Sequence, residues 1–461
     1  MTRVWSRSVR RAAVVVILAA SMGAALTVQS FSASSVHRTA LNHELDLFGE
    51  VVDLVRERYV DTPSDKKMIE GAINGMLSAL DPHSSYMTDD EFEKMTGEIS
   101  GEFGGVGLEV EDAHGGIRVV TVLDGTPASK SGLQTNDTIV KIDGQDTSGM
   151  SIDKAVTMMH GAPGTKVTLT VTRKGSDAPI SVSLKRDIIR VSPVQQRAEG
   201  NIAYIRIATF NGQTGEKLAA AIASSKKAIG PDIKGYVLDL RNNPGGLLDQ
   251  AVEVSSELIT KGGIVSIKGR KRADNETFSA DSTDLTNGKP IVVLINSGTA
   301  SAAEIVAGAL QDDKRAMVVG TRSFGKGTVQ TIVPLGGKNG ALRLTTARYF
   351  TPSGRSIQAK GIEPDVNVDE KIPETIRETL ASEILKGGER SLANHLKNPD
   401  GETAQESEPA AIPYIPENAN DDTQLQFALD FLKKLPAGAQ QVDITAPPRE
   451  MAATTPRPVA P

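Results

Sequence analysis

The apolar residues of this chain fall into two kinds of pattern. Short unbroken runs, PIVVLI at Pro290–Ile295 and GYVLDL at Gly235–Leu240, are typical of strands buried on both faces. Each run is followed by a glycine-containing turn and then by apolar residues at helical spacing, as in AAEIVAGALQ and LLDQAVEVSSELI. This alternation predicts an α/β core.

The two ends of the chain carry different patterns. Helical spacing in LFGEVVDLVRERYV and MIEGAINGMLSAL predicts a helical N-terminal region over 35–98. A C-terminal tail over 376–461 is rich in Pro, Ala, Glu and Asn, and its one convincing helix is QLQFALDFLKKL at 424–435. The final stretch, APPREMAATTPRPVAP, has the composition of a disordered segment.

Ser301 lies where the strand-like run Pro290–Ile295 turns into a helix pattern. The first N–H groups of a helix lack intrahelical partners, so the N–H of Ala302 is a candidate to stabilise an oxyanion. A serine hydroxyl needs a base to become a good nucleophile, and serine–lysine pairs are a known variant of the catalytic triad. The alternative is an ordinary N-cap serine, which is the commoner role at this position.

Lys326 follows in the glycine-rich stretch GTRSFGKGT, ahead of the strand-like TVQTIVPL. This stretch resembles a phosphate-binding loop, but Gly327 replaces the required serine or threonine and no helix pattern follows, which disfavours nucleotide binding. To act as a base near pH 7, Lys326 needs a pKa well below the ordinary value of about 10.4, and desolvation is the expected cause. Gln330 is placed to orient the amine. A solvated loop lysine is the alternative.

A third glycine-rich turn, RNNPGG, follows the strand-like run Gly235–Leu240 and leads into a helix pattern. Strand, glycine turn and helix together expose backbone N–H groups to an anion. The N–H of Gly245 or of Gly246 is therefore a candidate second oxyanion donor. Taken alone, the motif favours a structural turn over a donor site.

Other chemistries find little support in the composition. None of the histidines falls in the three stretches just described, which argues against a histidine triad, although His83 in LDPHSSYM and His160 in MMHGAPG have suggestive settings. There is no HExxH or similar metal-ligand spacing and no cysteine, so we expect no metal and no cofactor. A formal net charge of -6 gives no sign of nucleic-acid binding.

The order of LRNNPGG, SGTASAAEI and SFGKGTVQ resembles that of the carboxy-terminal processing peptidases, also called tail-specific proteases. The resemblance implies a crotonase-like protease core over 188–375. It also implies that Ser301 is the nucleophile, Lys326 the general base and Gln330 the residue that positions the lysine. Gly246 and Ala302 then form the oxyanion hole. Ala303 stands where many relatives have serine, a change that the start of a helix tolerates.

The stretch GEFGGVGLE resembles the carboxylate-binding loop of PDZ domains, with Gly105, Val106, Gly107 and Leu108 as the binding residues. In that loop, backbone N–H groups bind the terminal carboxylate of a peptide. Downstream, the pattern predicts a strand, a short helix, a turn and a strand, then an amphipathic helix in SIDKAVTMMHG and two further strands. An inserted, β-rich PDZ domain over 99–187 is expected.

The N-terminus predicts export from the cytoplasm. Arginines precede the apolar run AAVVVILAASMGAALTV, and we assign 1–34 to a signal peptide or membrane anchor. Its length lies between those of a signal peptide and a membrane span, so cleavage and anchoring both stay open. A periplasmic location, with possible anchoring to the inner membrane, is expected.

Together these features predict an exported serine endopeptidase that binds protein substrates with free, apolar C-termini and cleaves them through an acyl-enzyme. One rival hypothesis is a catalytically idle PDZ scaffold. Another is a PDZ domain that gates the enzyme by misplacing Lys326 until a tail binds. An adaptor or activator, membrane association through the N-terminus and a homo-oligomer all stay open as partners.

Overall fold

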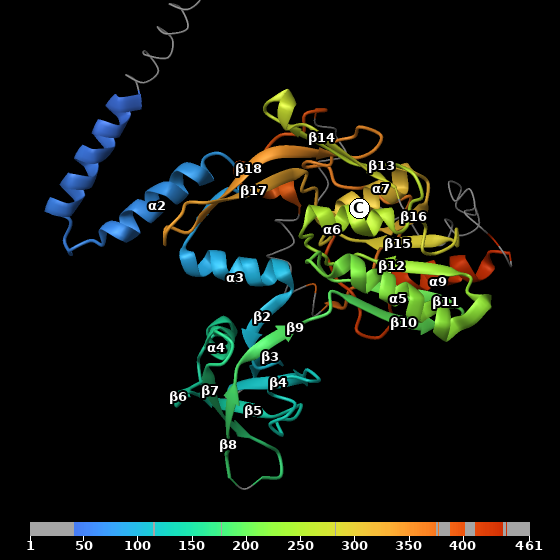
Figure 1. Cartoon of the computed structure of the whole chain (residues 1–461), viewed down its shortest axis with the longest axis horizontal. Helices are drawn as coiled ribbons and strands as arrows, with labels where there is room; N and C mark the ends of the chain where they lie inside the picture. Colours follow the sequence, from blue (N-terminus) through green and yellow to red (C-terminus); the bar gives the residue numbers. More distant parts are fainter. Residues whose placement is uncertain are drawn as a thin grey trace, which may run out of the picture. The chain divides into compact units, whose positions relative to one another are not determined.

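The computed structural model describes residues 41–113, 116–176, 178–281, 283–374, 377, 388–401, 411–436 and 439 (Figure 1). The chain divides into two units, 1–75 and 76–461. A helix spans 41–58 in the first unit, and α2, Asp65–Ser78, begins there and ends in the second. All elements described below belong to the second unit.

A six-stranded sheet forms the centre of the α/β core. β10 is antiparallel to β11, and the other neighbours are parallel. In order across the sheet its strands are β10 (Val194–Glu199), β11 (Ile202–Ile207), β12 (Gly235–Asp239), β15 (Ile291–Ile295), β16 (Ala316–Gly320) and β19 (Val366–Asn367). Every residue of β12, β15 and β16 is buried, as the unbroken apolar runs predict.

Helices cover both faces of this sheet. Three of them share one hydrophobic core with the sheet, and the fourth packs with the opposite face in a second core. The first three are α5 (Thr214–Ile229), α6 (Leu248–Ser256) and α7 (Ala302–Asp312), and the fourth is α9 (Thr423–Lys434). Short 3-10 turns occur at Gly230–Asp232, Arg272–Asp274 and Glu389–Ser391.

A second, antiparallel sheet packs on the same core through β13 and β18. Its strands are β1 (Ser85–Met87), β13 (Gly262–Gly269), β14 (Glu276–Ala280), β17 (Thr328–Pro334) and β18 (Ala341–Phe350). The range 35–98 was predicted from helical patterns, but its residues in β1 pair with β18 instead. Three residues are too few for a periodic signal.

The residues between α3 (Asp89–Ser100) and β10 form a small β-rich domain with its own core. β2 (Glu102–Gly105) pairs with β9 (Asp187–Arg190). The main sheet has the strand order β3 (Leu108–Ala113), β4 (Gly116–Val122), β5 (Thr138–Ile142), β7 (Lys166–Thr172) and β8 (Ile180–Lys185). β6 (Gln145–Asp146) pairs with β5, and α4 spans Ile152–Met159.

The prediction of a short helix after β4 is wrong. Residues 124–132 form a series of turns, bounded by Gly125 and Gly132 at positive φ. Lys130 N–H bonds the carbonyl of Thr126, whereas Ser131 N–H bonds that of Ala128, so no regular helical ladder forms.

Three predictions fall outside the described residues: the apolar segment near the N-terminus, most of the range 376–410 and the final stretch of the tail. Among the helices in the described ranges, none combines the length and apolar character needed to cross a membrane. The predicted helix at 424–435 corresponds to α9.

Candidate active site

Ser301 lies at the sharp turn between β15 and α7. Its backbone has φ 54° and ψ −117°, a positive-φ conformation that costs a non-glycine residue about 1–3 kcal/mol. Strained strand-to-helix turns of this kind present the nucleophilic serine of other hydrolases. Ser301 is the N-cap of α7 and forms a capping box with Glu304, whose Oε2 accepts the Ser301 backbone N–H at 2.8 Å. Its positive φ, however, differs from the extended backbone that is typical of an N-cap serine.

Tyr349 at the end of β18 is the aromatic neighbour of this serine. Its side chain is buried and is hydrogen-bonded with the side chain of Ser301. Burial raises the pKa of Tyr349 to about 12, so the phenol stays neutral at physiological pH. A neutral phenol beside Ser301 limits the positions open to the serine hydroxyl.

The glycine turn after β12 packs directly against the Ser301 turn. A Cβ on Gly245 would lie 2.8 Å from Ser301 Cβ and 2.9 Å from the nitrogen of Ala302, so no side chain fits at this position. The N–H of Gly245 donates to Asn243 Oδ1 at 2.8 Å. The N–H of Gly245 therefore already donates a hydrogen bond within the protein, which leaves the N–H of Gly246 as the candidate second oxyanion donor.

Gly246 is held in place by Phe210, with which it forms a parallel bridge. A Cβ on Gly246 would collide with the carbonyl oxygen of Phe210, and its φ of +141° also favours glycine. Ala302 is the first residue of α7, where an N–H has no partner within the helix. Gly246 and Ala302 therefore belong to the two segments that meet beside Ser301.

Lys326 lies in the loop between β16 and β17. Phe324 in this loop donates its N–H to the carbonyl of Thr299 at 2.9 Å, which joins the loop to the Ser301 turn. Burial lowers the pKa of Lys326, and the charge of Arg343 lowers it further. Glu389, Glu304 and Asp81 act in the opposite direction. A lowered pKa increases the fraction of neutral amine, the form that accepts a proton.

A buried carboxylate, Glu304 in the first turn of α7, binds both loops at once. Its Oε2 accepts the N–H of Ser301 at 2.8 Å and the N–H of Lys326 at 2.9 Å. Its Oε1 accepts the Ser323 hydroxyl at 2.5 Å and the Gly325 N–H at 2.7 Å. Burial raises the pKa of Glu304 to about 7, and these four hydrogen bonds oppose the rise. One side chain thus fixes the backbone of the candidate nucleophile relative to that of the candidate base.

Gln330 lies on β17, four residues after Lys326. Its amide nitrogen donates to Thr328 Oγ1 at 3.0 Å and to Thr345 Oγ1 at 3.1 Å. Among the described residues, no hydrogen bond joins Gln330 to Lys326. The role of Gln330 in orienting the lysine stays a prediction.

The candidate carboxylate loop lies between β2 and β3 and begins at Gly105, the last residue of β2. The carbonyls of Val106 and Gly107 accept the N–H groups of Ala128 and Leu123 at 2.9 and 3.0 Å. Because C=O and N–H point in opposite directions across a trans peptide, the N–H groups of Gly107 and Leu108 are turned away from these partners. This is the orientation that binding a terminal carboxylate requires.

Comparisons with known proteins agree with this architecture. Sequence profiles described as Peptidase family S41, PDZ domain and Activating protease CtpB N-terminal domain match residues 201–368, 104–184 and 14–91. A carboxy-terminal-processing protease of Bartonella bacilliformis is 47% identical over 413 residues, which cover 89% of this chain and 93% of that protein. The chain belongs to peptidase family S41. The resemblance to carboxy-terminal processing peptidases and the presence of a PDZ domain are thereby confirmed.

Two further proteins are similar to this chain at lower identity. The carboxy-terminal processing protease CtpA of Bacillus subtilis is 36% identical over 361 residues, which cover 77% of this chain and 76% of that protein. Among solved structures, the photosystem II D1 C-terminal processing protease is 31% identical, with a TM-score of 0.42, and the match covers 70% of this chain and 92% of that one.

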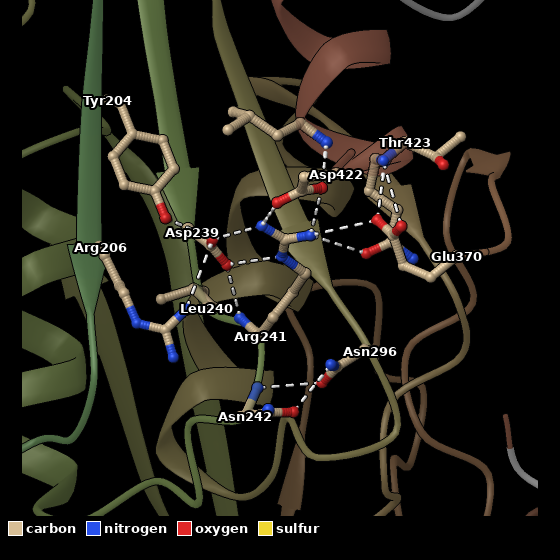
Figure 2. A network of polar contacts seen from close by, with 12 residues as sticks. Tyr204, Arg206, Asp239, Leu240, Arg241, Asn242, Asn296, Glu370, Asp422 and Thr423 are labelled. Atoms are coloured by element: carbon tan, nitrogen blue, oxygen red, sulfur yellow. Dashed lines mark hydrogen bonds and ion pairs between the residues drawn. The ribbon is translucent and has the colours of Figure 1, made fainter. Parts of the chain in front are cut away.

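A buried ion-pair network at the end of β12 was not predicted for this S41 peptidase (Figure 2). Arg241 is fully buried and binds Asp239 through Nε and Nη2 at 3.0 and 2.7 Å. It also binds Asp422 through Nη1 and Nη2 at 2.8 and 2.7 Å, and it lies 3.5 Å from Glu370. Although burial acts to raise it, the ion pair with Arg241 holds the pKa of Asp239 below its usual value.

This network joins the glycine turn to the C-terminal helix. Arg241 immediately precedes Asn242, where the turn begins, while Asp422 caps α9 by accepting the N–H of Leu425 at 2.8 Å. Two charged residues at the end of the apolar run GYVLDL were a usable signal, because buried charges require partners. The signal for Glu304 was weaker, since a glutamate in the first turn of a helix is ordinary.

Proposed function

We propose that this S41 peptidase is an exported serine endopeptidase that uses a serine–lysine dyad, with Ser301 as nucleophile and Lys326 as general base. The observation that carries the proposal is the bonding of one Glu304 carboxylate oxygen to the backbone N–H groups of both residues. The positive φ of Ser301 and the lowered pKa of Lys326 support the same roles. A solvated loop lysine would have neither this anchoring nor this pKa.

The proposed reaction proceeds in two steps. Ser301 Oγ attacks the scissile carbonyl carbon while Lys326 accepts the serine proton, and the N–H groups of Gly246 and Ala302 donate to the oxyanion. The C–N bond then breaks, Lys326 protonates the leaving amine, and the acyl group remains on Ser301 as an ester. A water molecule attacks this ester, passes its proton through Lys326 to Ser301 and releases the new carboxyl terminus.

Substrate selection is assigned to the PDZ domain. Val106 is 2% exposed and belongs to the core of this domain, and Leu108 packs against that core. Leu108 is partly exposed beside the carboxylate loop, and an apolar side chain at this position favours protein tails that end in small or aliphatic residues. Cleavage of matched substrates with apolar and acidic tails tests this preference, and equal rates for the two would contradict it.

The dyad is tested with the full-length chain and an unstructured polypeptide that ends in Val-Ala. Ser301→Ala and Lys326→Ala should each abolish cleavage while retaining tail binding, and Lys314→Ala serves as a matched lysine control. Lys314 is exposed and lies in the turn after α7. Cleavage that persists in both dyad variants would show that other residues carry the reaction. An inactive parent that binds tails would favour the idle scaffold.

Export and the fold of the core complete the proposal. The arginine-rich start and apolar run of 1–34 support a periplasmic location, anchored or released, which fractionation of cells expressing the tagged chain tests. Successive strand–turn–helix units, β12 to α6 and β15 to α7, support a crotonase-like core. A fully cytoplasmic protein would refute the assignment of export.

A further inference from the structure

A short segment before the PDZ domain contacts β18, the strand that pairs with β17, on which Gln330 lies. Asp81, which is 4% exposed, accepts hydrogen bonds at Oδ1 from the N–H groups of His83 and Ser84 and at Oδ2 from the Ser84 hydroxyl. Its Oδ1 also accepts the hydroxyl of Thr345 on β18 at 3.0 Å. Thr345 in turn donates its N–H to Ser84 Oγ at 3.1 Å. Asp81 and Thr345 are thus joined by a direct hydrogen bond and also through Ser84.

The direction of these hydrogen bonds follows from the chemistry of the groups. An ionised carboxylate only accepts, so the single hydroxyl proton of Thr345 is committed to Asp81. Toward Gln330, which lies opposite it on β17, Thr345 Oγ1 can therefore act only as a hydrogen-bond acceptor. The amide must therefore present its NH2 group to Thr345, and the second hydrogen of that group bonds Thr328 at 3.0 Å.

This arrangement leaves the carbonyl oxygen of Gln330 as the free end of the amide. Within the described part of the chain, no hydrogen bond occupies Oε1 of Gln330. The two threonines bond the NH2 end of the amide, and Gln330 follows Lys326 by only four residues. The unoccupied oxygen can only accept a hydrogen bond, so it is available to a donor such as the lysine amine.

We infer that Asp81 and Thr345 are positioning residues that set the polarity of the Gln330 amide, so that Gln330 Oε1 accepts from Lys326 and the amine lone pair is directed at Ser301. The inference rests on the proposed dyad and extends it to residues that touch neither substrate nor the reacting atoms. If the amide were flipped, its NH2 hydrogens would face Lys326. They would repel the charged ammonium form. The neutral amine would accept one of them, and its lone pair would then point away from Ser301.

A second chain of bonds from the same segment reaches the Lys326 loop. His83 Nε2 lies 2.7 Å from Glu389 Oε2, and Gln358 donates its Nε2 to Glu389 Oε1 at 3.0 Å. Gln358 Oε1 accepts the N–H of Gly327, the residue after Lys326, at 2.9 Å. Residues 81–84 therefore support both ends of the stretch from Lys326 to Gln330.

The inference is tested with full-length variants at Thr345. Thr345→Val keeps the shape but removes the hydroxyl, and we expect kcat to fall at least about tenfold while KM stays within about twofold, because only the orientation of the base is disturbed. Thr345→Ser restores the hydroxyl and should return most of kcat. Thr346→Val is the matched control on the same strand, since Thr346 bonds the exposed Thr331 instead. Parent kcat in Thr345→Val, with Lys326→Ala inactive, would overturn the inference.

Asp81→Asn gives a readout that a merely structural role would not move. Asparagine removes the charge of Asp81 but keeps a side-chain oxygen that can accept the Thr345 hydroxyl, so the readout is the pH dependence of kcat/KM and not its plateau value. The charged groups that act on Lys326 are Arg343, which lowers its pKa, and Glu389, Glu304 and Asp81, which raise it. Losing the Asp81 charge should therefore move the acid limb of the pH profile to lower pH.

The outcomes separate this inference from the proposed dyad. Full activity of Lys326→Ala would refute the dyad itself, whatever the Thr345 variants do. If thermal unfolding shows that Thr345→Val does not fold, Thr345→Ala and Thr345→Ser decide: parent kcat in Thr345→Ala would overturn the inference, and a loss of kcat that Thr345→Ser restores would support it.

Discussion

Replacing Arg241 with methionine should destabilise the protease core by about 3–5 kcal/mol. Methionine has a similar volume, so the change removes the charge and its hydrogen bonds without opening a large cavity. It leaves Asp239 and Asp422 buried at 0% and 3% exposure with no guanidinium between them. Breaking a buried ion pair from one side costs about this much, because the remaining charges are uncompensated. We expect the midpoint of thermal unfolding to fall by about 10 °C.

Two further measurements separate the ion pair from general packing effects. Asp422→Asn still caps α9 and should cost only about 1–2 kcal/mol. Adding it to Arg241→Met should cause little or no further loss, because it neutralises one of the uncompensated charges. The pKa of Asp239 is lowered in the native state, so its contribution is present above the unfolded value of about 3.9 and is lost as the pH falls through the native value.

The parent and Arg241→Met should therefore differ less in stability at low pH. Differential scanning calorimetry across the pH range checks each of these expectations. A melting temperature of Arg241→Met within about 2 °C of the parent, or additive losses in the double variant, would refute the reasoning.

Three further predictions concern the active site. Glu304→Gln offers one oxygen to four donors, so peptidase activity should fall at least about 100-fold, and full activity would contradict the linking role of this carboxylate. Arg343→Gln removes a charge that lowers the pKa of Lys326, so the acid limb of the pH–rate profile should move to higher pH; an unmoved limb would exclude this influence. Gly245→Ala should abolish cleavage, because its Cβ would contact the Ser301 turn, whereas Gly288→Ala at φ +73° has open space and should stay active; equal activity of the two would contradict this packing.

Local patterns predicted the elements that carry the candidate dyad. The apolar run before Ser301 and the helix after it are continuous in sequence, and the structure has β15 and α7 at these positions. The strand after Lys326 was likewise predicted from TVQTIVPL and is β17. In such segments, burial and helix propensity act over neighbouring residues, so a single sequence contains the information.

Contacts between distant residues could not be predicted in the same way. Asp81 and Thr345 are separated by 264 positions, and Arg241 and Asp422 by 181. No periodic pattern relates residues at such separations, and a local signal such as the charge of Arg241 after an apolar run does not identify the partner. The orientation inferred for the Gln330 amide rests on the bond between Asp81 and Thr345, so it could not be predicted for this candidate residue from the sequence alone.

The most direct test of the central claim is the identity of the covalent intermediate. The full-length peptidase would be mixed with an unstructured polypeptide ending in Val-Ala, quenched in acid during turnover, digested and analysed by mass spectrometry. The account predicts an ester between Ser301 and the new carboxyl end of the amino-terminal product, absent from Ser301→Ala and from Lys326→Ala. Continued cleavage by Ser301→Ala, or an adduct on a different residue of the parent, would contradict it.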